Sequence, residues 1–321
     1  MTEFSRTLLI GVDAGGSKTT AWVVDEADAL ELIHPQPLGR GSSGPANPTA
    51  NGFDTACRAI EQAIQNALVD AGIRLDHATQ PCQIKLCLSV AGVGREREKQ
   101  QMTDWAQTRF NPASLAVTDD AQPILAAASP QQVGIALICG TGSYAWGRGV
   151  DGLTDRCGGW GYLFGDEGSG YAIGVAGLTA AAKFADGRGE RTVLLDALCQ
   201  WLKIEKSSQL IESIYGGSTD RGAVARLSEV VFAAASEDAV ASGIVDQAVE
   251  GLSAMVHSLA PRLNFGSEDS GLSPILALGG GVLVHQPLLR QRLAEKLPDL
   301  AEKMAVVSTP VAGAIRIAGA E

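Results

Sequence analysis

Two glycine-rich turns in the sequence each place a hydroxyl residue directly after a glycine. In AGGSK, Ser17 follows Gly16, and in CGTGS, Thr141 follows Gly140. Successive backbone N–H groups in such turns can bind phosphate oxygens. A single turn of this kind is more simply explained as a plain β-turn, whereas two favour a pair of loops that bind a triphosphate from opposite sides. The chemistry they indicate is nucleotide binding.

Neither turn matches a familiar nucleotide-binding motif. The first, GVDAGGSKT, has Ser17 at the position where a P-loop requires Lys, and the second satisfies only the loose Rossmann glycine pattern. In both motifs the glycines open a helix whose N-terminal N–H groups bind phosphate. Here the sequences that follow, TTAWVVD and SYAWGRG, are strand-like. We therefore expect two β-hairpins whose turns bind phosphate.

Three carboxylates follow strand-like segments. Asp13 ends the first strand, where it could hold a hydrated Mg²⁺ beside the phosphates, because Mg²⁺ in such sites keeps several waters. Asp119 and Asp120 end the strand in VTDDA. One of them could cap the following helix. A carboxylate there could also orient an alcohol and take its proton during phosphoryl transfer.

Two further segments suggest the rest of a substrate site. The glycines of LGGGV, residues 278–282, would let the backbone approach a flat ring, as in an adenosine pocket, although an ordinary strand–helix turn is the alternative. The segment RCGGWGYLFGDEGSGY, residues 156–171, combines glycines, aromatic residues and acids. Trp160 could stack on a sugar ring and Asp166 could accept its hydroxyl groups, with helix capping by Asp166 or Glu167 as the simpler alternative.

Strands and helices must position these residues. Short apolar runs predict strands at residues 7–12, 20–24, 84–91, 114–118, 274–278 and 305–308, with a second hairpin at 134–149. Apolar residues at three- and four-residue spacing predict a helix from Phe53 to Gly72. A Gly/Ser/Pro/Asn loop is expected at 38–49. Residues 170–265 are helix-rich, apart from an interruption at 215–222.

The two hairpins indicate an internal repeat. When Trp22 is laid over Trp146, Gly16 falls on Gly140 and Ser17 on Thr141. At 321 residues the chain is long enough for two domains. We expect an α/β protein with an N-terminal lobe, residues 1–118, a C-terminal lobe, residues 119–309, and a final helix, residues 310–321, that packs back on the first lobe.

Composition limits the partners. The formal net charge of −11, without a run of Lys or Arg, argues against nucleic acid or an anionic membrane surface and favours small ligands. No stretch approaches the ~18 apolar residues of a membrane span, and the N-terminal apolar run is too short for a signal peptide. We therefore expect a cytoplasmic protein. The six cysteines form no CxxC pair and predict reduced thiols.

Several of these segments together resemble the N-acetylglucosamine kinase branch of the BadF/BadG/BcrA/BcrD ATPase family, within the actin, Hsp70 and sugar kinase superfamily. They are GVDAGGSKT, GPANP, VTDDA, CGTGS, CGGWG with GDEGS, LGGGV and TPVAGAIRIA, and they span essentially the whole chain. The CGGWG to GDEGS block is the most specific. The resemblance implies two ribonuclease-H-like lobes, ATP and Mg²⁺ in the cleft between them, closure over a hexosamine, and a homodimer.

The resemblance also implies roles for individual residues. Asp120 would be the base that activates the sugar 6-hydroxyl, because the family motif has the catalytic Asp directly before Ala; whether Asp119 shares this role stays open. Asp13 would lie near the metal, through water. The sugar would be held by Asn47, Gly159, Trp160 and Asp166. ATP would be bound by Gly15, Gly16, Ser17, Lys18, Gly140, Thr141, Gly142, Gly279, Gly280 and Gly281.

These implications predict an ATP-dependent kinase that phosphorylates the 6-hydroxyl of N-acetylglucosamine, with glucosamine as the alternative acceptor. One alternative of another class is an ATPase that activates a dehydratase through a metal cluster bridging two subunits. It needs paired cysteine ligands, and Cys139 and Cys157 are the cysteines near the motifs. The other is a sugar sensor that binds without turnover, against which an intact Asp120 argues.

Overall fold

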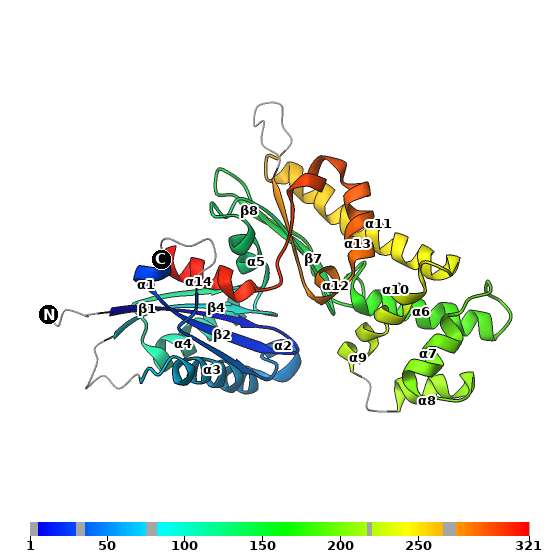
Figure 1. Ribbon diagram of the computed structural model, residues 1–321, viewed down its shortest axis with the longest axis horizontal. Coiled ribbons are helices and arrows are strands. Elements are labelled where there is room, and N and C mark those ends of the chain that lie inside the picture. Colours follow the sequence, from blue (N-terminus) through cyan, green and yellow to red (C-terminus); the bar gives the residue numbers. More distant parts are fainter. Residues whose placement is uncertain (1–5, 30–35, 75–81, 217–219, 266–273, 321) are drawn as a thin grey trace. The chain divides into compact units, whose positions relative to one another are not determined.

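The structure, a computed structural model, describes residues 6–29, 36–74, 82–216, 220–265 and 274–320 (Figure 1). It divides into two compact units: unit 1 comprises residues 1–132 with 309–321, and unit 2 comprises residues 133–308. The division differs from the expected boundary near residue 118. Helix α5 (Ala121–Ala128) stays with unit 1, because it packs against the C-terminal helix α14 (Pro310–Ala320).

Unit 1 is built on one mixed sheet with the strand order β3-β2-β1-β4-β5. The strand β1 pairs antiparallel with β2 and parallel with β4. Helices α3 and α4 cover one face, and α14 lies on the other face (Figure 1). Each face therefore has its own apolar core. The bounds are β1 (Arg6–Ala14), β2 (Thr19–Asp25), α1 (Glu26–Ala29), β3 (Gly39–Ser43), α2 (Pro48–Asn51), α3 (Phe53–Asp70), β4 (Cys82–Val90), α4 (Glu96–Phe110) and β5 (Ser114–Thr118).

The strand β3 lies in a segment that was expected to be a loop, so that prediction was wrong. Its glycines are needed because α3 packs directly on the strand. A Cβ added at Gly39 would clash with the backbone of Ala67, and one added at Gly41 would clash with the backbone of Ala63. Glycine in this strand therefore reflects the close approach of a helix and not a turn.

Unit 2 is built on a second mixed sheet with the strand order β10-β9-β6-β7-β8. The bounds are β6 (Gly134–Cys139), β7 (Ser143–Arg148), β8 (Thr154–Gly158), β9 (Ile275–Gly279) and β10 (Met304–Val306). Long helix α11 packs across β6, β7 and β8. The helices are α6 (Gly170–Ala185), α7 (Leu194–Leu202), η1 (Ser207–Gln209), α8 (Leu210–Tyr215), α9 (Arg221–Arg226), α10 (Ser228–Ala234), α11 (Ala239–Arg262), α12 (Gly281–His285), α13 (Pro287–Lys296) and η2 (Pro298–Lys303).

The two sheets share one topology, as the internal repeat predicted. In each, the first strand pairs antiparallel with the second and parallel with the fourth. The register adds a detail that the ungapped alignment missed. Trp22 pairs with Gly11, but Trp146 pairs with Ala136, so the second turn is one residue shorter than the first. Asp13 therefore corresponds to Ile138, and unit 2 has no carboxylate at that position.

None of the helices within the described ranges combines the length and the hydropathy that a bilayer crossing requires.

Candidate functional site

A row of polar side chains crosses the sheet of unit 1 at the carboxyl ends of its parallel strands. Asp13 in β1 pairs with Ser89 in β4, and Ser89 pairs with Thr118 in β5. Because directly paired residues point to the same face of a sheet, these three side chains share one face. It is the face that carries Leu9 and Cys87, which pack beside α14.

The negative charge of Asp120 acts on the carboxylate of Asp13. Burial and the negative charge of Asp120 raise the pKa of Asp13 to about 7. A divalent cation beside two neighbouring carboxylates would offset the repulsion between their charges. Within the described ranges no group of three or more His, Cys, Asp or Glu could enclose a metal. A pair of carboxylates suits a cation that keeps most of its water, as Mg²⁺ does.

The neighbouring acids Asp119 and Asp120 differ in their contacts. Oδ1 of Asp119 accepts the N–H groups of Ala121 (3.1 Å) and Gln122 (3.3 Å) at the start of α5. Burial and Asp120 raise the pKa of Asp119 to about 6, against the effect of these bonds. The side chain of Asp120 makes no capping hydrogen bond to α5. The structural task of capping thus falls to Asp119.

The first glycine turn lies beside the GPANP segment. The Gly15 carbonyl accepts the N–H of Ala46 (3.0 Å), and the Gly15 N–H donates to Lys18 within the turn (3.0 Å). A Cβ added at Gly16 would meet nothing within 4 Å, and Ser17 is exposed, so this turn offers open backbone to a ligand. It fits the phosphate cradle that the sequence predicted.

Asn47 uses its side-chain oxygen to cap the short helix α2. Oδ1 accepts the N–H groups of Thr49 (2.9 Å) and Ala50 (3.1 Å). A Cβ at Gly92 would lie 2.5 Å from that oxygen, so Gly92 leaves room for the cap. Any ligand that Asn47 holds would therefore meet its amide NH₂ group, which is a donor.

In unit 2 the second and third glycine turns come together. A Cβ on Gly140 would lie 3.7 Å from the backbone N of Gly281, and one on Gly280 would clash with the backbone of Cys139. Gly280 has φ +87°, a conformation that only glycine adopts readily. Gly279, which ends β9, pairs with Ile138 beside these turns. The structure thus brings 140–142 and 279–281 side by side, as a shared nucleotide site requires.

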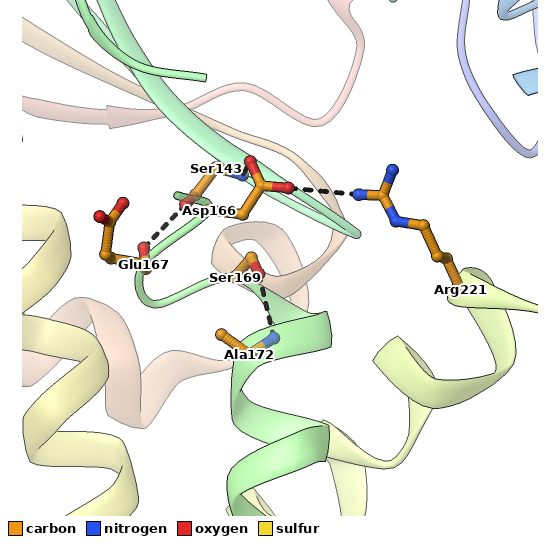
Figure 2. A network of polar contacts seen from close by, with 6 residues as sticks. All are labelled: Ser143, Asp166, Glu167, Ser169, Ala172 and Arg221. Carbon is orange, nitrogen blue, oxygen red and sulfur yellow. Dashed lines mark hydrogen bonds and ion pairs between the residues drawn. The ribbon is translucent and has the colours of Figure 1, made fainter. Parts of the chain in front are cut away.

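Asp166 lies beside Gly142 of the second turn, since a Cβ on Gly142 would lie 3.0 Å from Oδ1. Two donors hold its carboxylate (Figure 2). Oδ1 accepts the Ser143 N–H at 3.3 Å, and Nη2 of Arg221 lies 3.2 Å from Oδ2. The side chain of Asp166 is only 7% exposed. Burial and, to a smaller extent, the charge of Glu167 raise its pKa, while the Ser143 N–H and the Arg221 charge oppose the rise. Asp166 also has φ +57°, a left-handed conformation that Asp tolerates better than most residues.

The aromatic side chain expected to meet a sugar is exposed. Trp160 is 64% exposed, and the guanidinium of Arg156 lies 5.9 Å from its ring centroid. Gly159, with φ +71°, packs over the side chain of Tyr144. Two other large apolar residues of this segment, Leu163 and Phe164, are exposed as well. Unit 2 therefore presents an apolar surface next to a buried carboxylate, the combination that sugar binding uses.

Sequence reasoning missed several residues of this site. Arg221 lies 55 residues from Asp166, in the segment that was expected only to interrupt the helices. Ser89 and Thr118 look like ordinary strand residues, and only the register aligns them with Asp13. No local pattern marks these residues, because a glycine after a predicted strand, such as Gly92, signals only a turn.

Comparison with known proteins bears on this site. The family model for the BadF/BadG/BcrA/BcrD ATPases matches residues 10–320. The chain belongs to the BadF/BadG/BcrA/BcrD ATPase family. This confirms the family that the sequence motifs indicated.

Relatives of this ATPase-family chain include two named sugar kinases. The N-acetylmuramic acid/N-acetylglucosamine kinase of Clostridium acetobutylicum is 31% identical over 278 residues, which are 86% of this chain and 85% of that protein. The N-acetyl-D-glucosamine kinase of Dictyostelium discoideum is 29% identical over 98% of both chains. These relatives match the chain over nearly its whole length.

Solved structures confirm the fold of this family member. A Chromobacterium violaceum protein proposed to be an N-acetylglucosamine kinase superposes with a TM-score of 0.76, at 24% identity, over 97% of this chain and 98% of its own. At that identity the comparison speaks for the fold alone. It agrees with the α/β prediction of two lobes, each built on a ribonuclease-H-like sheet.

Proposed function

We propose that this protein is an ATP-dependent hexosamine kinase that phosphorylates the 6-hydroxyl of N-acetylglucosamine. The single observation that carries the proposal is the division of labour between Asp119 and Asp120. Asp119 caps α5 through its side chain. The helix therefore does not need the Asp120 carboxylate as its cap. A carboxylate at this position can orient the sugar hydroxyl and accept its proton. The two kinase relatives support the substrate class.

ATP would be held by the three glycine turns. Backbone N–H groups of Gly16, Ser17 and Lys18, and of Thr141 and Gly142, would bind the phosphates. The glycines 279–281 would border the adenosine, because Gly281 offers open backbone. Asp13 would hold Mg²⁺ through water. Bound Mg²⁺ supplies charge neutralisation on the phosphate oxygens.

The sugar would be held by side chains of both kinds, polar and aromatic. Asp166 would accept hydrogen bonds from ring hydroxyls, and the amide NH₂ of Asn47 would donate to a sugar oxygen. Trp160, beside Gly159, would cover a face of the ring. The cytoplasmic location and the homodimer also stay proposals; light scattering of the purified protein tests the dimer.

The decisive experiment is a coupled assay of ADP release with Mg-ATP and a panel of sugars. We expect N-acetylglucosamine to stimulate ADP release strongly over the sugar-free rate. An analogue with hydrogen in place of the 6-hydroxyl should bind without turnover, and NMR of the product should show phosphorus coupled to the C6 protons. Sugar-independent ATP hydrolysis, or a product phosphorylated elsewhere, would contradict the proposal.

Two other acceptors belong in the panel. Glucosamine tests whether the acetyl group is required. N-acetylmuramic acid is included because the Clostridium relative is named for both sugars. A higher kcat/KM for either sugar than for N-acetylglucosamine would reassign the acceptor and leave the kinase proposal in place.

The assay also separates the two rival functions. A dehydratase activator needs cysteines that can reach a partner, but Cys139 is fully buried and its thiol donates to the Gly168 carbonyl (3.2 Å). Iron measured in the purified protein, with ATP hydrolysis in the absence of sugar, would favour that reading. Sugar binding without any ADP release would favour a sensor.

A further inference from the structure

Arg221 connects the start of helix α9 to the carboxylate of Asp166. Asp220 caps α9, because its Oδ1 accepts the Ala223 N–H at 2.7 Å, and this fixes the backbone that carries Arg221. From there Nη2 of Arg221 reaches Oδ2 of Asp166 at 3.2 Å. In Figure 2 Arg221 approaches Asp166 from α9, while Ser143 contacts the other carboxylate oxygen. The two donors therefore hold Asp166 from separate elements.

Two tyrosines hold the guanidinium of Arg221. Its central carbon lies 4.5 Å from the ring centroid of Tyr162 and 5.8 Å from that of Tyr171. The two rings meet edge to face, with centroids 5.2 Å apart. A planar guanidinium gains from such contacts in a way that an ammonium group does not. Tyr162 lies two residues after Trp160 in the same segment, so Arg221 contacts both Asp166 and the segment that carries Trp160.

Burial and a neighbouring negative charge both act against the ionised form of Asp166. It is nearly fully buried, and Glu167 lies next to it as a second negative charge. A protonated carboxyl would lose acceptor capacity, because one oxygen would carry a proton. Arg221 is the cation that opposes this, and the Ser143 N–H adds a neutral donor.

We infer that Arg221 is a positioning residue for the sugar: stacked on Tyr162 and Tyr171, it holds the Asp166 carboxylate ionised and oriented to accept sugar hydroxyls. The inference rests on the proposed function, since it assumes that Asp166 binds sugar. It assigns to Arg221 no contact with the reacting atoms. Its effect should therefore fall on sugar binding and spare both ATP binding and the proton transfer at Asp120.

The test compares Arg221→Met with wild type and with Arg226→Met, a control that removes the same charge from the same helix. We expect Arg221→Met to raise the KM for the sugar roughly 10- to 100-fold at pH 7, as expected for loss of a charged hydrogen bond, and to leave the KM for ATP within about twofold. Arg226→Met should behave as wild type. Arg221→Lys should recover part of the loss, because it keeps the charge without the planar stack.

A pH profile separates positioning from a merely structural role. Without Arg221 the pKa of Asp166 should rise, so the sugar KM of Arg221→Met should worsen more at pH 5.5 than at pH 8. A double-mutant cycle with Asp166→Asn adds a second readout. If Arg221 acts through Asp166, Arg221→Met should add little in that background.

The outcomes distinguish the two proposals. A wild-type protein with no sugar-dependent ADP release overturns the proposed function and this inference with it. A wild-type kinase whose Arg221→Met variant keeps the sugar KM and its pH profile overturns this inference alone, as does full additivity with Asp166→Asn. If Arg221→Met does not fold, the same comparisons are made with Arg221→Lys, whose sugar KM must then exceed that of wild type.

Discussion

Asp13 and Asp120 are electrostatic neighbours in unit 1: burial raises the pKa of Asp13 to about 7, and the negative charge of Asp120 adds to the rise. The two acids come from different strand ends, β1 and β5, which β4 separates in the sheet. Their proximity is therefore a product of the fold and not of local sequence. It suits a site that binds a hydrated cation with one acid and handles a proton with the other.

The first prediction concerns the two adjacent acids. Asp120→Asn should lower kcat by about 10²- to 10⁴-fold, the usual contribution of general base catalysis, with ATP affinity nearly unchanged. Asp119→Asn keeps a side-chain oxygen for the cap and should retain most of kcat, while Asp119→Ala should lose about 1 kcal/mol of stability. Steady-state kinetics and urea unfolding measure both. Equal losses of kcat in Asp119→Asn and Asp120→Asn would show that the acids share the role.

The second prediction concerns Asp13 and pH. The pKa of Asp13 is raised to about 7, so from about pH 4 to about pH 7 the unfolded chain is ionised while the folded protein keeps the proton. The unfolded state then binds fewer protons, and the free energy of unfolding should fall with rising pH, by up to about 1.4 kcal/mol per pH unit. In EDTA, Asp13→Asn should lose this slope and be more stable than wild type at pH 8. If the free energy of unfolding changes with pH in the same way in wild type and Asp13→Asn, the prediction is wrong.

Metal addition extends the same prediction. Mg-ATP should raise the Tm of the wild-type protein at pH 8, because a ligand that binds only the folded state stabilises it. The rise should be much smaller in Asp13→Asn, whose amide cannot neutralise a cation. Asp25→Asn, which changes an acid at the far end of the same hairpin, is the matched control and should keep the full rise. Differential scanning fluorimetry measures all three.

Apolar strands were predictable from the sequence, and glycine-rich or polar strands were not. The runs at 84–91 and 114–118 correspond closely to β4 and β5, because both segments are short and rich in apolar residues. The strand β3 reads GRGSS and β8 reads TDRCG. Their residues follow from partners far along the chain, such as α3 against β3, which no local pattern contains.

In the candidate site, too, features set by the local sequence were predictable, and contacts between distant segments were not. The glycine-rich turns at 15–18 and 140–142 were predictable from the sequence, because the conformation that each turn needs is a local property. Phosphate binding by these turns stays a prediction. The contact between Asp166 and Arg221 depends on how α9 packs in unit 2, 55 residues away. Assignment of the cap to Asp119 instead of Asp120 depends on the direction in which α5 leaves β5. Both required the structure.

The third prediction separates folding from ligand binding in the glycine cluster 279–281. Gly280→Ala should destabilise the protein by about 3 kcal/mol, because it combines φ +87° with a clash against Cys139. Gly281→Ala should fold normally, since a Cβ there meets nothing within 4 Å, but should raise the KM for ATP. Urea unfolding and kinetics test the pair. An unchanged KM for ATP in Gly281→Ala would remove that residue from the nucleotide site.

The fourth prediction concerns β3, the strand in the segment that was expected to be a loop. Gly41→Ala should destabilise the protein by about 3 kcal/mol, because its Cβ would displace α3 from β3. Gly44→Ala, in the loop directly after β3, meets nothing within 4 Å and is the matched control. It should change stability by less than about 0.5 kcal/mol. Similar losses in both variants would mean that this segment is sensitive to any side chain, independently of the contact with α3.

The fifth prediction concerns Asp238, a buried acid in unit 2 outside the proposed active site. Oδ1 caps α11 through the Ala241 N–H (2.9 Å), and Oδ2 accepts from the Val193 N–H (2.6 Å) and the Thr192 hydroxyl (2.8 Å). Burial alone would raise the pKa of Asp238, but these bonds outweigh it and lower the pKa. Its stabilisation is therefore fully present above the unfolded pKa of about 3.9 and is lost as the pH falls through the folded value.

Asp238→Ala should accordingly cost about 2–4 kcal/mol at pH 7, the sum expected for a helix cap and a charged hydrogen bond. Asp238→Asn should cost less, because the amide oxygen can still cap α11. The difference between wild type and Asp238→Ala should shrink below about pH 4, because the unfolded chain then takes up a proton that the folded carboxylate, with its lowered pKa, does not. Urea unfolding at pH 7, 5 and 3.5 measures the difference in free energy of unfolding between wild type and Asp238→Ala. If this difference stays constant across the range, the charge of Asp238 contributes nothing to stability.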